Sequence, residues 1–287
     1  MLSEFDFKSP ATLDECLAAM MAEEESVAPI AGGTNLVIDL RNGRARPQTV
    51  VNLWQLSGLS YLRQENGHVA IGGRTTVTEL LNSPLIQQTG RSIIESADLF
   101  ASPLIRNRAT VGGNLADASP AADLAPPLLA LGADVILTSQ NETRIVPLDE
   151  FFLAPRKTVR QPSELLTEIR YPRPSEKGNS TFLKLGLRLE DAISVVSVAA
   201  YLECEGDVCQ TVRIALGAVA PTPRRAKSAE ALLLRQPLTE ALIRDAAQAA
   251  ANQDASPIDD VRGSAEYRRW MVEVMVRRAV MSLWSLT

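Results

Sequence analysis

The sequence predicts an α+β protein in two parts. Strand-like and helical segments alternate as far as residue 171, and a Pro/Gly/polar-rich stretch without apolar periodicity follows at 172–180. Beyond this stretch, strand-like segments precede helical ones. We therefore expect a first domain at 1–174, with subdomains at about 1–55 and 56–174. A small C-terminal α+β domain is expected at 175–287, with a three-stranded sheet backed by helices.

The first subdomain is expected to be a small βαβ-like unit. The pattern Thr12-Leu13-Asp14-Glu15 resembles a capping box, which favours a helix start. The expected elements are a strand at 5–7, a helix from 12 to about 21, a strand at 27–30, a short helix at 35–40 and a strand at 49–53.

The second subdomain is expected to mix hairpins and helices. Its elements are a hairpin of 59–62 and 68–71, helices at 76–81, 92–99 and 122–131, a hairpin of 134–138 and 143–146, and a strand at 165–171. Pro126 and Pro127 fit only in the first turn of their helix. This places Asp123 near the helix N-terminus, facing the segment at 110–114.

The C-terminal part has three expected strands and three expected helices. The strands are at 181–187, 193–202 and 212–219, and the helices at 226–234, 239–251 and 264–284. In the last helix, apolar side chains share one stripe at Val272, Val276, Ala279 and Leu283. Trp270 and Trp284 on this helix are interpreted as core residues rather than cofactor contacts.

Composition excludes several classes of protein. The net charge of −5 and the lack of a polybasic run argue against nucleic-acid binding. No apolar run reaches the roughly 18 residues of a membrane span. The N-terminus lacks the basic and apolar regions of a signal peptide, so we expect a cytoplasmic protein.

The cysteines and the one histidine exclude most metal and hydrolytic sites. Cys16, Cys204 and Cys209 are too few for a disulfide framework or for the four thiolates of an iron–sulfur cluster. Cys204 and Cys209 are expected to face each other across a hairpin. His68 is interpreted as a surface turn residue, so the chain has neither a Ser-His-Asp triad nor a histidine zinc site.

Two Gly-Gly segments have similar neighbours. They are Ala31-Gly32-Gly33-Thr34-Asn35-Leu36 and Thr110-Val111-Gly112-Gly113-Asn114. Both follow apolar, strand-like residues and are interpreted as loops in which glycine allows φ > 0 and leaves main-chain N–H groups open to a ligand. Neither contains a basic side chain, which favours phosphate binding through backbone dipoles. For each segment alone, a turn without a ligand is the alternative.

The two segments together favour a bound dinucleotide. Neither is followed by the Lys-Ser/Thr of a P-loop, and neither has the three spaced glycines of the dinucleotide fingerprint. Two phosphate-binding segments suit the two phosphates of a pyrophosphate. A transferred phosphoryl group would require metal ligands and charged clamps.

Segments 31–36 and 105–115, continued by Ser119-Pro120-Ala121-Ala122-Asp123-Leu124-Ala125-Pro126, resemble known motifs. They are similar to the two FAD-binding motifs of molybdenum hydroxylase flavoprotein subunits. These are the medium subunits of the carbon monoxide dehydrogenase and xanthine dehydrogenase family. The resemblance extends to the length of the chain and the order of its domains.

The resemblance implies a vanillyl-alcohol-oxidase-type (PCMH-type) FAD-binding domain of two α+β subdomains, followed by the small C-terminal domain. The residues it implies for FAD are Pro29, Ile30, Ala31, Gly32, Gly33, Thr34, Asn35, Leu36, Thr110, Val111, Gly112, Gly113, Asn114, Ser119, Asp123, Leu166 and Lys184. Segments 29–36 and 110–114 would hold the pyrophosphate and ribityl chain.

The remaining residues have individual implied roles. Asp123 would hydrogen-bond the cofactor, and Leu166 and Lys184 would lie beside the flavin ring, where a cation stabilises the reduced form. A solvated lysine at a strand edge is the alternative for Lys184. For Ser119 the alternatives are a ligand donor and a helix N-cap. The first segment has no His or Cys, so the FAD is expected to be non-covalent.

The implied function is electron transfer within a heteromeric complex. A large partner would hold the molybdenum cofactor, a small partner two [2Fe–2S] clusters, and the FAD of this chain would pass electrons to an external acceptor such as NAD, oxygen or a quinone. No catalytic residue and no metal are expected in this chain. The alternatives are a self-contained FAD oxidoreductase of the same fold and a non-redox nucleotide-binding scaffold.

Overall fold

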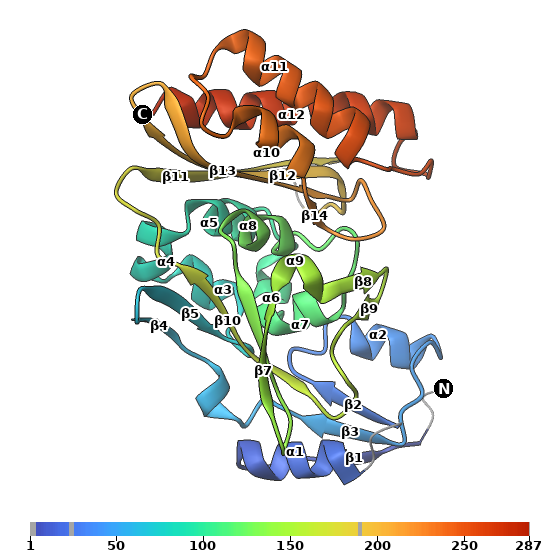
Figure 1. Ribbon diagram of the computed structural model, residues 1–287. Coiled ribbons are helices and arrows are strands. Elements are labelled where there is room, and N and C mark those ends of the chain that lie inside the picture. Colours follow the sequence, from blue (N-terminus) through green and yellow to red (C-terminus); the bar gives the residue numbers. More distant parts are fainter. Residues whose placement is uncertain (1–3, 23–25, 189–190, 287) are drawn as a thin grey trace.

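The structure, a computed structural model, describes residues 4–22, 26–188 and 191–286. Residues 1–3, which belong to the N-terminal segment interpreted above, lie outside these ranges. Figure 1 shows three levels: a small sheet beside the N-terminus, a larger sheet with helices in the middle, and a sheet covered by long helices at the C-terminal end. Mixed α+β content is therefore confirmed.

The first level is a three-stranded parallel sheet in the order β1-β3-β2. Its elements are β1 (Asp6–Lys8), α1 (Leu13–Ala22), β2 (Val27–Ile30), α2 (Leu36–Arg41) and β3 (Thr49–Asn52). Cys16, Leu17 and Met20 of α1 are buried in one cluster with Val51 and Leu53. Parallel pairing through a helical crossover confirms the βαβ-like unit.

The second level is a five-stranded antiparallel sheet in the order β4-β5-β10-β6-β7. The strands are β4 (Leu62–Glu65), β5 (His68–Gly72), β6 (Asp134–Thr138), β7 (Thr143–Pro147) and β10 (Leu165–Pro172), with a small separate pair, β8 (Phe152–Ala154) and β9 (Lys157–Thr158). The helices are η1 (Ser57–Leu59), α3 (Val77–Leu81), α4 (Pro84–Thr89), α5 (Arg91–Asp98), α6 (Pro103–Arg106), α7 (Val111–Ala116), α8 (Ala125–Ala130) and α9 (Leu148–Phe151).

The third level is an antiparallel sheet in the order β11-β12-β13-β14. Its elements are β11 (Gly178–Gly186), β12 (Ser194–Glu205), β13 (Val208–Gly217), β14 (Arg224–Arg225), α10 (Lys227–Leu233), α11 (Glu240–Ala249), the π-helical η2 (Ala250–Asp254) and α12 (Ala265–Trp284). Cys204 and Cys209 are paired in register between β12 and β13, which confirms that they face each other across the hairpin.

The C-terminal sheet is covered on both faces. Helices α10 and α12 pack on one face, with α11 packed against both of them, and α5 and α8 pack on the other face, as Figure 1 shows. Every residue of β12 from 194 to 202 is buried as a result. Ala199, Tyr201 and Ala215 of this sheet belong to the same apolar cluster as α5 and α8. A strand buried on both sides reads as a largely apolar run, as 193–202 does.

Some expected elements differ from the structure. The C-terminal sheet has a fourth strand, the two-residue β14, which is too short to give a sequence pattern. The first hairpin begins at Leu62 instead of residue 59, because 57–59 forms a 3₁₀ turn. Helix α4 was not expected, and the helix expected at 122–131 is regular only over Ala125–Ala130.

The stripe predicted on the last helix is confirmed, but one of its tryptophans is not in the core. Val272, Val276, Ala279 and Leu283 are fully buried. Trp270 is 63% exposed and packs edge-on against Tyr267, so its interpretation as a core residue was wrong. Trp270 lies outside the apolar stripe of α12. Its aromatic side chain suggested burial, but its position on the helix did not.

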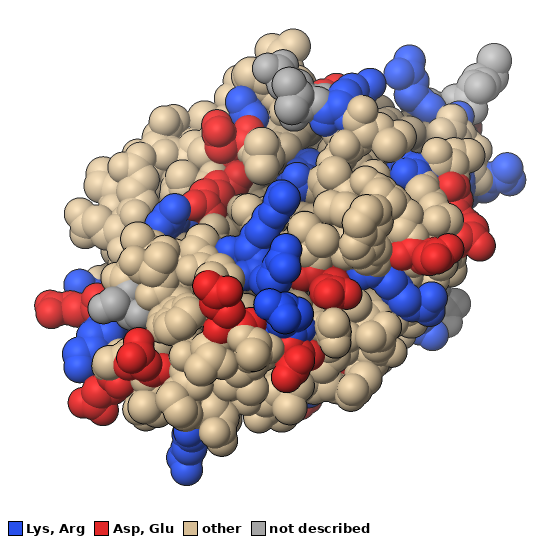
Figure 2. All heavy atoms as spheres, turned by 90° about the horizontal axis from the view of Figure 1, so that it is seen from above, with Lys and Arg blue, Asp and Glu red and all other residues tan. Residues whose placement is uncertain are grey.

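Among the residues that the structure describes, no helix is long and apolar enough to cross a bilayer. Figure 2 shows basic and acidic side chains interspersed over the face seen from above Figure 1. This face therefore carries no extended field of one sign.

We predict that burial decides the cost of truncating α12. Leu283→Ala removes a fully buried side chain and should lower the free energy of unfolding by about 2–5 kcal/mol. Trp270→Ala removes a larger but exposed side chain and should cost about 0.5 kcal/mol or less. Urea unfolding of both variants measures this, and a larger loss for the tryptophan variant would contradict the assigned packing.

Candidate functional site

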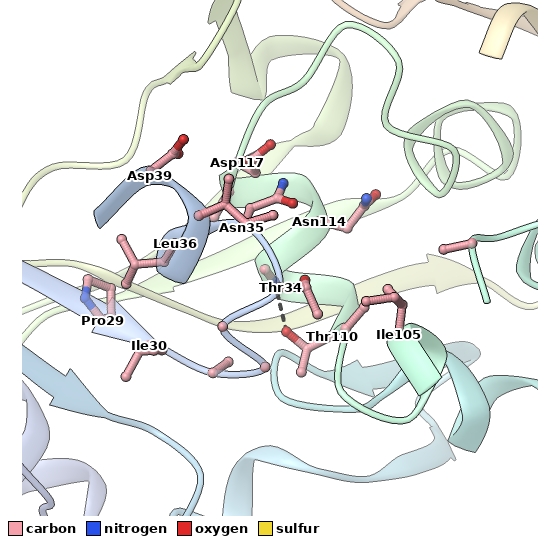
Figure 3. Close-up of a pocket in the computed structure, with 18 of the residues that line it drawn as sticks. Pro29, Ile30, Thr34, Asn35, Leu36, Asp39, Ile105, Thr110, Asn114 and Asp117 are labelled. Carbon is pink, nitrogen blue, oxygen red and sulfur yellow. Dashed lines mark hydrogen bonds between the residues drawn. The ribbon is translucent and has the colours of Figure 1, made fainter. Parts of the chain in front are cut away.

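A cavity of about 690 Å³ lies where the two Gly-Gly segments meet. Every residue from 29 to 36 lines it, together with Thr110, Gly113 and Asn114. Figure 3 shows both segments around this space, one entering α2 and the other entering α7. The volume falls within the usual range of small-molecule and cofactor sites.

The first segment is the loop that joins β2 to α2. Gly33 has φ +72°, a left-handed conformation that favours glycine, so its expected loop role is confirmed. Among the described residues, the amides of Gly32, Gly33 and Thr34 have no hydrogen-bond acceptor. Main-chain N–H groups at the start of α2 are thus free to bind a ligand at the cavity wall.

The second segment differs from its expected conformation. Gly112 and Gly113 lie in the first turn of α7, and neither has a positive φ. Thr110 is the N-cap, and its hydroxyl accepts a hydrogen bond from the Gly113 amide at 3.1 Å. The preceding residues form α6 and a turn rather than a strand. The interpretation as a strand followed by a φ > 0 loop was therefore wrong.

Close packing explains the glycines of the second segment. A Cβ on Gly112 would lie 2.5 Å from the carbonyl oxygen of Gly73. Gly72 ends β5, and the next residue, Gly73, contacts α7 at Gly112. The first Gly-Gly segment also contacts the longer motif 105–115 that contains the second one, because a Cβ on Gly32 would lie 1.8 Å from the carbonyl oxygen of Arg108.

A cluster of ion pairs joins two helices at the outer wall of the cavity. Arg156 donates hydrogen bonds to the carboxylates of Asp39 in α2 and Asp117 at the end of α7. Asn35 also lies beside Asp117, as Figure 3 shows. Burial raises the pKa of Asp117, although Arg156 and the Asn35 side chain act in the opposite direction. These contacts join α2 to α7.

The wall contains one buried polar atom without a partner. The side-chain Oδ1 of Asn114 has no hydrogen-bond partner among the described residues. Buried polar atoms are normally satisfied, so an unpaired acceptor in a cavity wall is suited to accept a hydrogen bond from a ligand. The open amides of 32–34 can donate to phosphate oxygens, and the Asn114 Oδ1 can accept from a ribose or ribityl hydroxyl.

A smaller cavity of about 80 Å³ adjoins the first. The two share Pro29, Ala31, Gly113, Ala116 and Arg160, and the smaller one is also lined by Leu166 and Gly112. Of the implied residues, Val111 is buried in the core and lines neither. Ser119 also lines neither, and its hydroxyl accepts from the Ala121 amide, as a local cap does.

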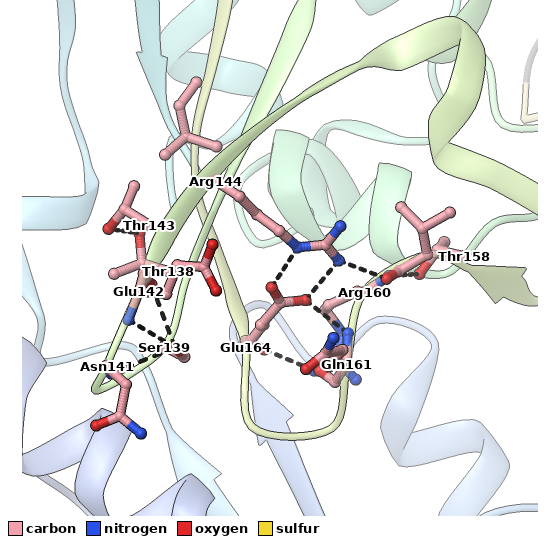
Figure 4. Close-up of polar contacts among 12 residues, drawn as sticks. Thr138, Ser139, Asn141, Glu142, Thr143, Arg144, Thr158, Arg160, Gln161 and Glu164 are labelled. Atoms are coloured by element: carbon pink, nitrogen blue, oxygen red, sulfur yellow. Dashed lines mark hydrogen bonds and ion pairs between the residues drawn. The ribbon is translucent and has the colours of Figure 1, made fainter.

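Arg160 is a cavity residue that the sequence did not reveal. Its guanidinium donates to the carbonyls of Gln161, Pro162 and Glu164, and burial lowers its pKa. The Glu164 carboxylate accepts two hydrogen bonds from Arg144, as Figure 4 shows. This network braces the turn before β10 that carries Arg160 to the cavity.

Asp123 and Lys184 form a buried ion pair behind the cavity. The Lys184 Nζ lies 2.6 Å from Asp123 Oδ2, and its side chain is 6% exposed, so it is not a solvated edge lysine. Ser194 donates to Asp123 Oδ1 at 2.5 Å. Burial raises the pKa of Asp123, while Lys184 and Ser194 act in the opposite direction.

This pair connects wall segments from distant parts of the chain. Lys184 Nζ also donates to the Leu99 carbonyl at 3.0 Å, next to the wall residues Phe100 and Ala101. Ser194 follows the wall residue Ile193. Asp123 was expected to face the segment at 110–114, but its carboxylate faces Lys184 and Ser194 instead. The predicted helix start placed the backbone of Asp123 correctly, but the partners of its side chain, Lys184 and Ser194, belong to β11 and β12.

Phe100, Ala101, Asp191 and Ile193 are wall residues that lie outside both predicted motifs. Arg106 fixes the first of these segments by donating to the carbonyls of Asp98 and Phe100. No local pattern marks these four residues, because tertiary packing brings them to the site.

The chain is similar to known flavoproteins along nearly its whole length. Residues 3–174 match the family described as the FAD binding domain in molybdopterin dehydrogenase, and residues 181–283 match the CO dehydrogenase flavoprotein C-terminal domain. The carbon monoxide dehydrogenase medium chain of Hydrogenophaga pseudoflava is 30% identical, over 98% of this chain and 97% of the relative. A putative xanthine dehydrogenase FAD-binding subunit of Escherichia coli is 31% identical, over 96% of each chain.

Solved structures share the fold. Carbon monoxide dehydrogenase from H. pseudoflava, in a form lacking the Mo-pyranopterin moiety of its molybdenum cofactor, superposes with a TM-score of 0.96 at 31% identity, covering 99% of both chains. Quinoline 2-oxidoreductase from Pseudomonas putida gives a TM-score of 0.91 at 26% identity, over 99% of this chain and 98% of that one.

We predict that Lys184→Met destabilises the protein in a pH-dependent manner. The variant leaves the buried Asp123 carboxylate without its cation, which should cost about 3–5 kcal/mol near neutral pH. Without Lys184 the pKa of Asp123 should rise further. The folded variant then takes up a proton at a pH where the unfolded chain is still ionised, so the deficit should shrink as the pH falls through the folded-state pKa.

Urea unfolding between pH 7 and pH 5 measures this effect. Lys227→Met is the matched control, since its ion pair with Asp149 involves a lysine side chain that is 71% exposed. It should cost about 1 kcal/mol or less. A deficit for Lys184→Met that does not change with pH would contradict the ion-pair assignment.

Proposed function

The chain belongs to the family of FAD-binding subunits of molybdenum hydroxylases, and from that premise we propose that it carries electrons within such a complex. Its relatives are dehydrogenase subunits, so the chain is an oxidoreductase component. A small partner with [2Fe–2S] clusters would supply electrons, and a large partner with the molybdenum cofactor would oxidise the substrate. An external acceptor such as NAD, oxygen or a quinone would receive them.

The observation that carries this proposal is the wall of the 690 Å³ cavity. Open amides at 32–34 and the unpaired Asn114 Oδ1 face one space from two directions. Segments 29–36 and 110–114 would hold the pyrophosphate and ribityl chain of FAD. Since the first segment has no His or Cys, the FAD would be bound non-covalently.

The other residues implied for FAD would have different roles. Leu166 lines the smaller adjoining cavity, where an apolar side chain suits the flavin ring. Asp123 and Lys184 form an ion pair with each other, so they would hold the cavity wall in place and determine the charge near the flavin ring. Ser119 is further from the wall and would support the turn before α8. When bound, FAD supplies the redox chemistry, and this chain binds and orients it.

We extend the proposal to the domain boundaries of the chain and to its cellular location. The chain would divide at about residue 174, with subdomains at about 1–55 and 56–174, and the ranges of the two family matches support this. A cytoplasmic location suits three buried cysteines that are not joined in disulfides.

Purification of the chain with and without co-expressed partners tests this function. We predict that the chain yields FAD on denaturation, and that substrate reduces this FAD only in the assembled complex. Absence of flavin would indicate a non-redox scaffold. Steady oxidation of a substrate by the isolated chain would indicate a self-contained oxidoreductase.

We predict that Asn114→Ala weakens FAD binding without destabilising the apoprotein. Its Oδ1 has no partner within the described chain, so removal breaks no internal hydrogen bond through that atom. Loss of one hydrogen bond to the cofactor, worth about 0.5–1.5 kcal/mol, corresponds to a roughly 2- to 12-fold higher Kd.

Fluorescence titration with FAD measures the Kd, and thermal unfolding of the apoprotein measures stability. Asn141→Ala, in an exposed hairpin turn, is the matched control and should leave the Kd unchanged. Equal FAD affinity in the two variants would contradict the assignment of Asn114.

A further inference from the structure

A separate cavity of about 220 Å³ lies between the C-terminal sheet and the segment that leads into it. It is lined by Leu131, residues 172–175, Tyr201 and Glu203 of β12, and Thr211 and Arg213 of β13. None of these residues lines the two cavities described above. The FAD assignment therefore leaves this space unexplained.

Arg213 on its wall differs from the other arginines that are not exposed. Seven others have a hydrogen-bond acceptor: a backbone carbonyl for Arg74, Arg106 and Arg160, and a carboxylate for Arg144, Arg225, Arg262 and Arg268. The eighth, Arg170, forms an ion pair with Asp134, with Nε 3.6 Å from a carboxylate oxygen. For Arg213, no carboxylate or carbonyl of a described residue pairs with the guanidinium. Its N–H groups are therefore available to an acceptor that enters the cavity.

Two contacts hold this guanidinium at the cavity. Its Cζ lies 5.4 Å from the centre of the Tyr201 ring, directly across the β12–β13 pair. Gly132 lies against the other side, where a Cβ would be 3.2 Å from Arg213 Nε. Burial and the neighbouring charge of Arg225 lower the pKa of Arg213, because both disfavour its charged form, whereas Tyr201, Glu230 and Glu203 act in the opposite direction. An anion in the cavity would favour the charged form further.

The remaining wall offers further donors. Arg173 is exposed at the rim, and the hydroxyls of Ser175 and Thr211 line the cavity. The carboxylate of Glu203 is also on the wall and accepts from the Tyr201 hydroxyl at 3.3 Å. The cations Arg213 and Arg173 outnumber the carboxylate of Glu203, so the wall of this cavity carries a net positive charge.

We propose that this cavity binds a small oxyanion, with the Arg213 guanidinium as its principal partner. A planar guanidinium can donate two parallel hydrogen bonds to a phosphate or carboxylate group. The hydroxyl of Thr211 and the charge of Arg173 would complete the site. The volume suits an anion of this size better than a nucleotide, since larger ligands occupy roughly 300 Å³ or more.

The test is calorimetric titration of the full chain saturated with FAD, so that phosphate cannot enter the flavin cavity. Inorganic phosphate and acetate are titrated in separate experiments at constant ionic strength, with chloride as the reference anion. We expect saturable binding of one or both. Phosphate binding alone would identify a phosphate site, and acetate binding alone a carboxylate site.

Arg213→Met keeps the length of the side chain and removes its charge, and should weaken binding at least about tenfold. Arg244→Met, at an exposed position on α11, is the matched control and should bind as the wild type does. Thr211→Val is a second, milder variant and should weaken binding severalfold. Absence of binding to the wild-type chain, or equal binding by Arg213→Met, Thr211→Val and the wild type, would overturn the proposal.

Discussion

The contact between the first Gly-Gly segment and the motif 105–115 is the constraint on which the rest of the site depends. Backbone atoms of Gly32 and Arg108 approach so closely that no side chain fits between them. The same need for close approach applies to Gly112 against Gly73. These contacts place the loop before α2 and the first turn of α7 on two sides of one cavity, although about 80 residues separate them in the chain.

Ion pairs then fix the walls that the glycines cannot reach. Arg156 joins α2 to α7 through Asp39 and Asp117 at the outer side. Lys184 and Asp123 join β11 to the start of α8 at the inner side. Since the buried Lys184–Asp123 pair costs desolvation, its value lies in orientation as much as in stability. The cavity is thereby shaped before any ligand binds.

The sequence predicted the fold class, most strands and the two segments that form the cavity. These features depend on local signals, namely apolar periodicity, capping residues and paired glycines. The conformation of the second segment was mistaken because helical and left-handed glycines look alike in a sequence. The partners of Asp123 and Lys184, and the wall residues Phe100, Arg160 and Ile193, could not be predicted. Their positions follow from the packing of α5, α8 and β11, which no local pattern encodes.

The FAD affinity of Gly32→Ala tests the central claim most directly. A methyl group at residue 32 would push the first segment away from Arg108, whereas Gly58→Ala, in open space, is a matched control. We predict that Gly32→Ala loses at least about tenfold in FAD affinity, while Gly58→Ala binds as the wild type does. Wild-type affinity in a correctly folded Gly32→Ala protein would show that FAD does not depend on the contact between the two segments.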